Sequence, residues 1–119
     1  MLFRSCSSPE TWDAVIDCWG GGLFVDDPSR LNKNQPVEAI SLAANLNAPL
    51  LGLFGNEDEG PSPAEVDRLE ARLQELGKTY EFYRYDGAGH SFMTTDRHRY
   101  RPEQAMDAWK RLKIGRAHV

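Results

Sequence analysis

The stretch Asp-Gly-Ala-Gly-His-Ser-Phe, residues 86–92, decides how the rest of this sequence is interpreted. It follows the six-residue run Tyr80–Tyr85, in which aromatic and charged side chains alternate between bounding glycines, a pattern typical of a β-strand. The glycines before His90 let the backbone turn sharply. We therefore predict that His90 lies on a loop at the carboxyl end of a strand, where open α/β sheets place their chemistry.

An acidic residue follows a second predicted strand in the same way. The apolar run of residues 48–55 is short and almost uninterrupted, which indicates a strand buried on both faces. Asp58 lies in the acid-rich turn that follows at once. A lone histidine is more often a surface or structural residue, but an acid and then a histidine after successive strands is the order of an α/β-hydrolase triad. This order makes Asp58 and His90 candidate catalytic residues.

The other expected elements complete an α/β pattern. Residues 62–76 form the best-defined helix, because they begin with the capping box Ser-Pro-Ala-Glu and carry apolar residues on one face. Residues 12–19 predict a further strand, residues 37–46 a short helix, and the segment from Pro102 a last helix with Ala105, Ala108, Trp109 and Leu112 on one face. Residues 6–9 are expected to form a loop.

Six segments together resemble the C-terminal half of the dienelactone hydrolase family, whose members are carboxymethylenebutenolidase-like enzymes. They are residues 13–23, 53–58, 62–76, 80–92, 100–102 and 108–109. The resemblance covers about residues 11–112 and is specific in order and spacing. It implies the C-terminal part of an α/β-hydrolase fold, with about three parallel strands and flanking helices.

The resemblance also implies an activity. Asp58 and His90 would be two members of a Cys-His-Asp or Ser-His-Asp triad that hydrolyses an ester or a lactone, without a cofactor. The nucleophile would lie upstream of the chain, so the isolated chain is expected to be inactive and poorly soluble. Glu57 and Glu59 flank Asp58 and could take its place, although the last acid of Gly-Asn-Glu-Asp matches the family position.

Cys18 is a poor candidate for the nucleophile. A nucleophile elbow needs the pattern Gly-x-Cys-x-Gly on a strand-to-helix turn. The residue two before Cys18 is Ile16, and no helix is expected to follow directly. Cys6 and Cys18 form no metal spacing or disulfide framework, so both are expected to be free thiols.

The substrate is less closely defined. Family members hold a substrate carboxylate with an arginine shortly after the histidine, and Thr94 stands at that position here. Arg97 and Arg99 follow within a few residues and are possible substitutes. The departure favours a dienelactone hydrolase-like esterase over a true dienelactonase.

Two other functions stay open. A non-catalytic α/β binding domain would keep the fold and lack a nucleophile at the elbow. A metal-dependent hydrolase would use His90, His98, Asp58 and Asp96, but no two of the histidines have helical spacing, so a metal site is not expected.

Composition excludes several other classes. The 119 residues carry a net charge of −4, and no stripe of Lys and Arg indicates a nucleic-acid partner. There is neither an apolar run long enough to span a membrane nor a signal-peptide pattern. We expect a cytoplasmic protein that acts on a small molecule and engages no membrane.

The residues at the two ends of the chain are not expected to belong to the natural protein. Residues 1–5 and 114–119 can be encoded by inverted complementary strings that match a widely used sequencing adapter. Both segments are therefore expected to be adapter-derived, and residues 6–113 to be the natural portion.

Overall fold

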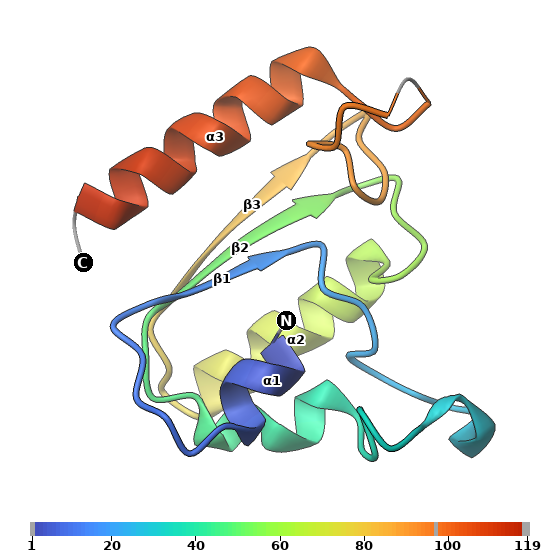
Figure 1. Ribbon diagram of the computed structural model, residues 1–119, viewed down its shortest axis with the longest axis vertical. Helices are drawn as coiled ribbons and strands as arrows, with labels where there is room; N and C mark the ends of the chain where they lie inside the picture. Colours follow the sequence, from blue (N-terminus) through green and yellow to red (C-terminus); the bar gives the residue numbers. More distant parts are fainter. Residues whose placement is uncertain (1, 97, 118–119) are drawn as a thin grey trace.

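A parallel sheet of three strands forms the centre of the molecule (Figure 1). The structure is a computed structural model that describes residues 2–96 and 98–117. The strands β1 (Val15–Cys18), β2 (Leu50–Gly55) and β3 (Tyr80–Tyr85) lie in the order β1-β2-β3. Leu50 of β2 is opposite Val15 on one side and Tyr80 on the other. The parallel strands and the α/β class predicted from the sequence are confirmed.

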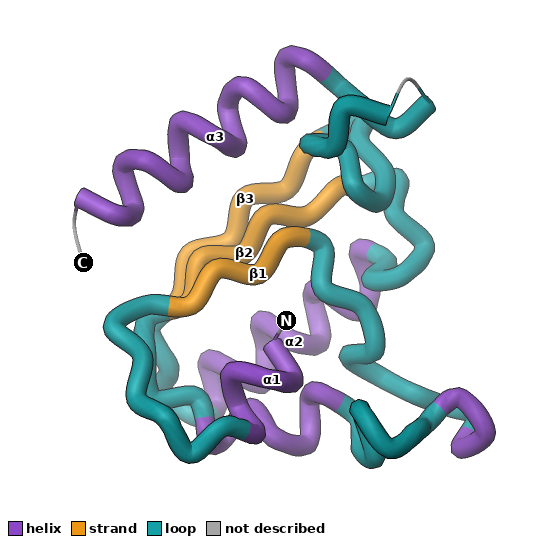
Figure 2. The backbone as a smooth tube through the Cα atoms, viewed as in Figure 1, coloured by secondary structure: helices purple, strands orange, loops and turns teal. Residues whose placement is uncertain are grey.

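Helices cover both faces of this sheet (Figures 1 and 2). The helices α1 (Leu2–Ser7) and α2 (Pro63–Glu75) lie on one face with the 3-10 helix η2 (Ala39–Asn45). The helix α3 (Pro102–Ala117) lies alone on the other face, and a 3-10 turn, η1 (Pro28–Arg30), interrupts the long loop after β1. Because helices cover both faces, β2 can be apolar on both sides.

The helix α2 begins and ends as its sequence predicts. The Ser62 hydroxyl accepts a hydrogen bond from the Glu65 amide, and the Glu65 carboxylate lies 3.3 Å from the same hydroxyl. Gly77, with φ of +65°, lies just beyond the C-terminal end in the left-handed conformation that glycine tolerates best. Three apolar side chains of the predicted face are buried against the sheet: Val66, Leu69 and Leu73.

The core has two parts, one on each face of the sheet. The larger part joins the sheet to α1, α2 and η2, and its buried members include Leu2, Val15, Ala43, Leu50, Phe54 and Leu69. The smaller part lies beneath α3, and its buried members are Leu53, Ala88, Phe92 and Ala108. Ala88 and Phe92 come from the loop that carries His90, so this loop is part of the core.

The N-terminal region differs from the prediction in two respects. Residues 6–9 were expected to form a loop, but Cys6 and Ser7 belong to α1, which ends shortly before Pro9. The strand expected over residues 12–19 is shortened to Val15–Cys18. Pairing begins only where Val15 meets Leu50, and the left-handed backbone of the next residue after Cys18 ends the strand.

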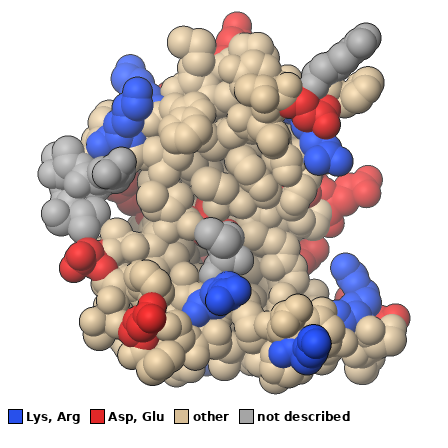
Figure 3. All heavy atoms as spheres, viewed as in Figure 1, with Lys and Arg blue, Asp and Glu red and all other residues tan. Residues whose placement is uncertain are grey.

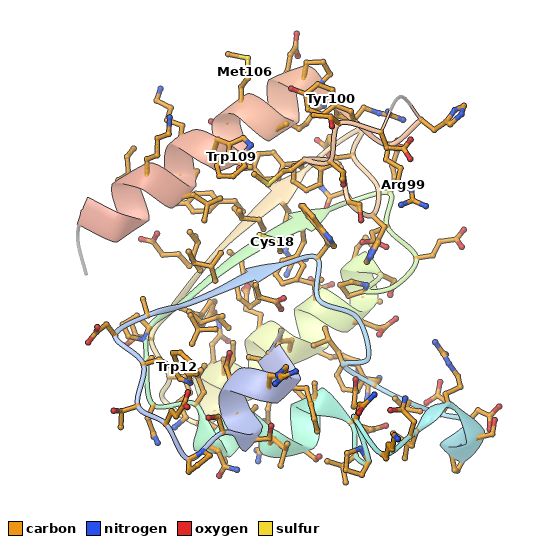
Figure 4. All side chains as sticks on the ribbon, viewed as in Figure 1. Trp12, Cys18, Arg99, Tyr100, Met106 and Trp109 are labelled. Carbon is orange, nitrogen blue, oxygen red and sulfur yellow. The ribbon has the colours of Figure 1, made fainter. Side chains whose placement is uncertain are left out.

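Two helices also differ from expectation. The short helix expected over residues 37–46 is present over Ala39–Asn45 and has 3-10 geometry. In α3, Ala105 and Ala108 are buried as predicted, but Trp109 is 54% exposed, because it lies at the margin of the apolar stripe and is not covered by a neighbouring element. Figure 4 shows Trp109 and Met106 on α3, and Trp12 near the opposite end of the molecule.

On the face seen in Figure 3, the acidic and basic side chains of the described residues are interspersed and form no area of a single charge. Among the described residues, no helix combines the length and the apolar character needed to cross a membrane.

Candidate active site

The loops that leave β2 and β3 are joined at the carboxyl edge of the sheet. The Asn56 amide donates to the Tyr85 carbonyl at 2.9 Å, and the Glu57 amide donates to the Ala88 carbonyl at 2.9 Å. The Asn56 side-chain amide also donates to the Asp86 carboxylate at 2.8 Å. These bonds continue the pairing of β2 and β3 beyond their last residues. They fix the loop that carries Asp58 against the loop that carries His90.

A glycine makes this close approach of the two loops possible. A Cβ atom on Gly55 would lie 2.2 Å from the carbonyl oxygen of Ala88, which is a backbone atom that belongs to the core. Only a residue without a side chain fits at the end of β2. The sequence shows this glycine as the end of an apolar run, but its reason is a contact with a segment more than thirty residues later.

Asp58 and His90 form a hydrogen-bonded pair across these loops. Nδ1 of His90 lies 2.9 Å from Oδ2 of Asp58. The other oxygen, Oδ1, accepts a hydrogen bond from the Gly60 amide at 2.8 Å. The Asp58 side chain is only 3% exposed, whereas the His90 side chain is 49% exposed. The acid is therefore held in place from two sides, and the imidazole reaches the surface.

The pair has a defined proton arrangement. An ionised carboxylate can only accept hydrogen bonds, so Nδ1 of a neutral His90 donates its proton to Asp58. The lone pair of the neutral imidazole is then on Nε2. A histidine arranged in this way can accept a proton from a hydroxyl or a thiol on its open side.

The two glutamates that flank Asp58 in the sequence are more exposed than Asp58. Glu57 and Glu59 are exposed, whereas Asp58 is buried and contacts the imidazole. The structure therefore brings together the two residues predicted to be catalytic, Asp58 and His90. The catalytic role itself stays a prediction.

Cys18 lies on β1 and is half-buried in the smaller part of the core. Burial, with a further contribution from Asp17, raises the pKa of its thiol to about 11. Within the described residues, neither Cys18 nor Cys6 is hydrogen bonded to His90, and both thiols are free. The thiol is thus protonated at neutral pH and has no base beside it, unlike an activated nucleophile.

A tryptophan that the sequence analysis did not single out also belongs to the site. The rings of Trp19 and His90 are 6.4 Å apart and inclined at 66°, and Trp19 also contacts Phe92. The only signal in the sequence is a bulky aromatic residue directly before three glycines.

The loop after His90 presents polar side chains to solvent. Thr94 is exposed, and its hydroxyl donates to the Ser91 carbonyl. Arg99 is exposed as well, and Figure 4 shows its side chain on this loop. Arg97 lies outside the described residues. Neither of the two described residues is brought against the His90 ring by a contact within the part of the chain that the structure describes.

Arg101 holds this loop to the segment before His90. Its guanidinium donates to the carbonyls of Gly87, His98 and Tyr100, each at 3.1 Å. His98 is exposed. In the described part of the chain, no group of three His, Cys, Asp or Glu residues could hold a metal ion.

Comparison with known proteins gives a consistent result. The model of the dienelactone hydrolase family matches residues 1–114, including residues 1–5, whose origin in an adapter stays a prediction. A candidate carboxymethylenebutenolidase of Methylorubrum extorquens is 38% identical over 116 residues, covering 81% of this chain and 39% of that protein. A candidate carboxymethylenebutenolidase of Escherichia coli is 33% identical over 94 residues, covering 79% of this chain and 33% of that protein.

Solved structures show the same fold. A candidate dienelactone hydrolase from Klebsiella pneumoniae superimposes with a TM-score of 0.79 at 28% identity, covering 93% of this chain and 44% of that one. The acylaminoacyl peptidase of Pyrococcus horikoshii shares the fold with a TM-score of 0.72 at 18% identity, covering 95% of this chain and 21% of that one. The chain spans less than half the length of these relatives. With the family model matched along nearly all of its length, the chain belongs to the dienelactone hydrolase family.

Proposed function

We propose that the protein of which this chain is a part hydrolyses a carboxylic ester or a lactone through a triad that includes Asp58 and His90. The observation that carries the proposal is the 2.9 Å contact between Nδ1 of His90, whose side chain is 49% exposed, and the buried carboxylate of Asp58. This is the acid and histidine arrangement of a hydrolytic triad. Membership of the dienelactone hydrolase family supports the same reaction class.

The chemistry follows from the pair. A hydroxyl or thiol that approaches Nε2 transfers its proton to His90 as it attacks the ester carbonyl. The imidazolium that forms is stabilised by the Asp58 carboxylate, which also keeps the ring oriented. His90 then donates the proton to the leaving alcohol, and the same base activates the water that hydrolyses the acyl-enzyme. Each step needs the ring to stay hydrogen bonded to Asp58 while Nε2 exchanges protons.

The proposal includes a nucleophile outside residues 6–113. Cys18 does not suit this role, because its pKa is about 11 and, among the described residues, it is not hydrogen bonded to His90. The outer edge of β1 has no partner strand among the described residues, and the chain covers 39% of a relative that it matches over most of its own length. These observations support residues 6–113 as the C-terminal portion of a larger α/β-hydrolase domain.

For the substrate we propose a simple ester or lactone. Thr94 occupies the position where the family resemblance implies a carboxylate-binding arginine, and Arg99 is exposed on the same loop. A neutral ester carries no carboxylate, so its binding does not require an arginine at position 94. No cofactor enters the proposed reaction.

The first test is to sequence the DNA upstream of the codon for Cys6. We expect an in-frame Gly-x-Cys-x-Gly or Gly-x-Ser-x-Gly motif within roughly the preceding twenty codons. An open reading frame without that motif would overturn the hydrolase proposal and favour a non-catalytic binding domain. The same sequence would show whether residues 1–5 belong to the natural gene.

The second test is enzymatic. The longer protein is assayed with a p-nitrophenyl ester and with an unsubstituted lactone, and His90→Gln is expected to abolish turnover of both. His98→Gln is the matched control, since His98 is exposed on the same loop and is not in contact with Asp58. Equal activity of the two variants would contradict the proposal.

A further inference from the structure

Trp19 is placed against the imidazole by an unusual backbone conformation. In β1, Val15 is buried in the part of the core that includes α1, and Cys18 packs against the part beneath α3. Strand alternation puts Asp17 on the same face as Val15 and Ile16 on the same face as Cys18. Strand alternation would put Trp19 on the α1 face with Asp17. Its φ of +45° reverses this direction, and the indole packs in the smaller part of the core with Cys18.

In the part of the chain that the structure describes, left-handed backbone at residues other than glycine occurs next to the candidate site. Among the described residues, the only two such positions are Trp19 and Ser91, which has φ of +62° and directly follows His90. Bulky side chains disfavour this conformation, which persists only where the surroundings impose it. Of the three glycines that follow Trp19, Gly22 is also left-handed, with φ of +69°, but the turn directly after β1 is made at the tryptophan.

The contacts of Trp19 connect all three strand ends. Its backbone amide donates to the carbonyl of Leu53 on β2 at 2.9 Å. Its ring lies edge to face with Phe92 at 5.3 Å and with His90 at 6.4 Å, both within the range of favourable aromatic pairs. Phe92 is fully buried and also contacts Tyr85 of β3. The indole therefore contacts a fully buried ring as well as the imidazole.

The imidazole needs such a support. Asp58 holds His90 through one atom, Nδ1, and a single hydrogen bond leaves the half-exposed ring free to pivot about it. Pivoting would move Nε2 while keeping the bond to Asp58. A rigid aromatic ring at the side of the imidazole limits this motion.

We propose that Trp19 is a positioning residue for His90: its indole, turned toward the imidazole by a left-handed backbone, fixes the direction of Nε2. The inference deepens the hydrolase proposal and rests on it for its catalytic consequence. The contact between the two rings can be tested without any activity.

The contact is tested by tryptophan emission. Removing an imidazole that contacts an indole should change the emission of that indole. At one fixed pH, the emission of the 119-residue chain should therefore differ from that of His90→Gln. The difference should persist when both chains also carry Trp12→Phe or Trp109→Phe, which leave Trp19 in place, and it should vanish when both carry Trp19→Phe. Equal emission from the wild-type chain and His90→Gln, when circular dichroism shows both chains folded, would overturn the contact.

The positioning role is tested by enzyme kinetics in the longer protein. If the 119-residue chain does not fold alone, the emission difference between wild type and His90→Gln is measured in the longer protein as well. Trp19→Ala is expected to lower kcat by about 10- to 100-fold, because small misplacements of a catalytic group have effects of this size. KM should change by less than about threefold, since the lost interaction belongs to the transition state. Trp19→Phe should restore most of the activity.

Trp109→Ala is the matched control, because Trp109 is exposed on α3. Equal kcat values for Trp19→Ala and Trp109→Ala would contradict a positioning role. If the wild-type protein hydrolyses no ester while its emission still differs from that of His90→Gln, the hydrolase proposal fails and the ring contact stands.

Discussion

His90 Nδ1 and Asp58 Oδ2 lie 2.9 Å apart, although 32 residues separate them in the chain. The distance is set by two neighbouring parallel strands, β2 and β3, whose carboxyl ends meet at one edge of the sheet. The backbone bonds between the following loops then fix the two side chains relative to each other. The pair is therefore a property of the sheet edge and not of either loop alone.

Changing Asp58 to Asn should remove the acceptor for the His90 proton and favour the wrong tautomer. In the longer, active protein we expect kcat to fall by about four orders of magnitude, as for the equivalent change in a Ser-His-Asp triad. Steady-state kinetics with an ester substrate measure this effect. Glu57→Gln and Glu59→Gln are the controls, because both side chains are exposed, and they should retain wild-type rates. A similar loss in either control would assign the orienting role to another acid.

Changing Gly55 to Ala should destabilise the protein through the Ala88 carbonyl, which would lie 2.2 Å from the new methyl group. The backbone of the His90 loop must move to relieve this clash, and overpacking of this kind costs about 1–3 kcal/mol. Thermal unfolding measures the loss. Gly60→Ala provides a matched control, because a Cβ atom there meets nothing within 4 Å. If both variants unfold at the same temperature, the close approach of the two loops does not contribute to the free energy of unfolding.

Asp17 is a buried carboxylate on β1, and neither of its side-chain oxygens has a hydrogen-bond partner among the described residues. Burial raises the pKa of Asp17 in the folded chain above its unfolded value of about 3.9. The folded state therefore binds this proton more tightly than the unfolded state. Its contribution to stability is complete below the unfolded pKa and is lost as the pH rises through the folded pKa.

Asp17→Asn should consequently stabilise the protein at neutral pH. We expect a gain of at least about 1 kcal/mol at pH 7, since an uncharged amide costs less to bury than an ionised carboxylate. The gain should shrink as the pH is lowered toward the unfolded pKa. Unfolding measured at several pH values checks this trend, with the exposed residue Asp13 changed to Asn as the control. A gain that does not depend on pH would show that the charge of Asp17 is not its cause.

Cys18 should react slowly with alkylating reagents in the folded chain. With a pKa of about 11, only on the order of one thiol in a thousand is ionised at pH 8, and alkylation should be about two orders of magnitude slower than in the unfolded chain. Peptide mapping by mass spectrometry separates Cys18 from Cys6. The rate should rise as the pH approaches 11. Rapid alkylation of Cys18 at neutral pH would instead mark it as an activated thiol and reopen its candidacy as the nucleophile.

Local sequence patterns were sufficient for the elements that carry their own signals. The helix α2 was predictable because Ser62, Glu65 and Gly77 specify its ends within the segment itself. The strand β3 has the predicted bounds, Tyr80–Tyr85, because glycines bound an alternating run. The 3-10 geometry of residues 39–45 was not predictable, since an apolar face at that spacing does not distinguish it from a short α-helix.

The order of strands, acid and histidine can be read directly from the chain, and that order predicts the α/β class and the candidates Asp58 and His90. The contact between Asp58 and the imidazole, and the exposure of Glu57 and Glu59, depend on how β2 and β3 pair, so they follow from the fold. The fold also brings Trp19 into the site. A single left-handed φ turns that side chain from one face of the sheet to the other, and the reason lies in contacts with Leu53 and Phe92, which are distant in sequence.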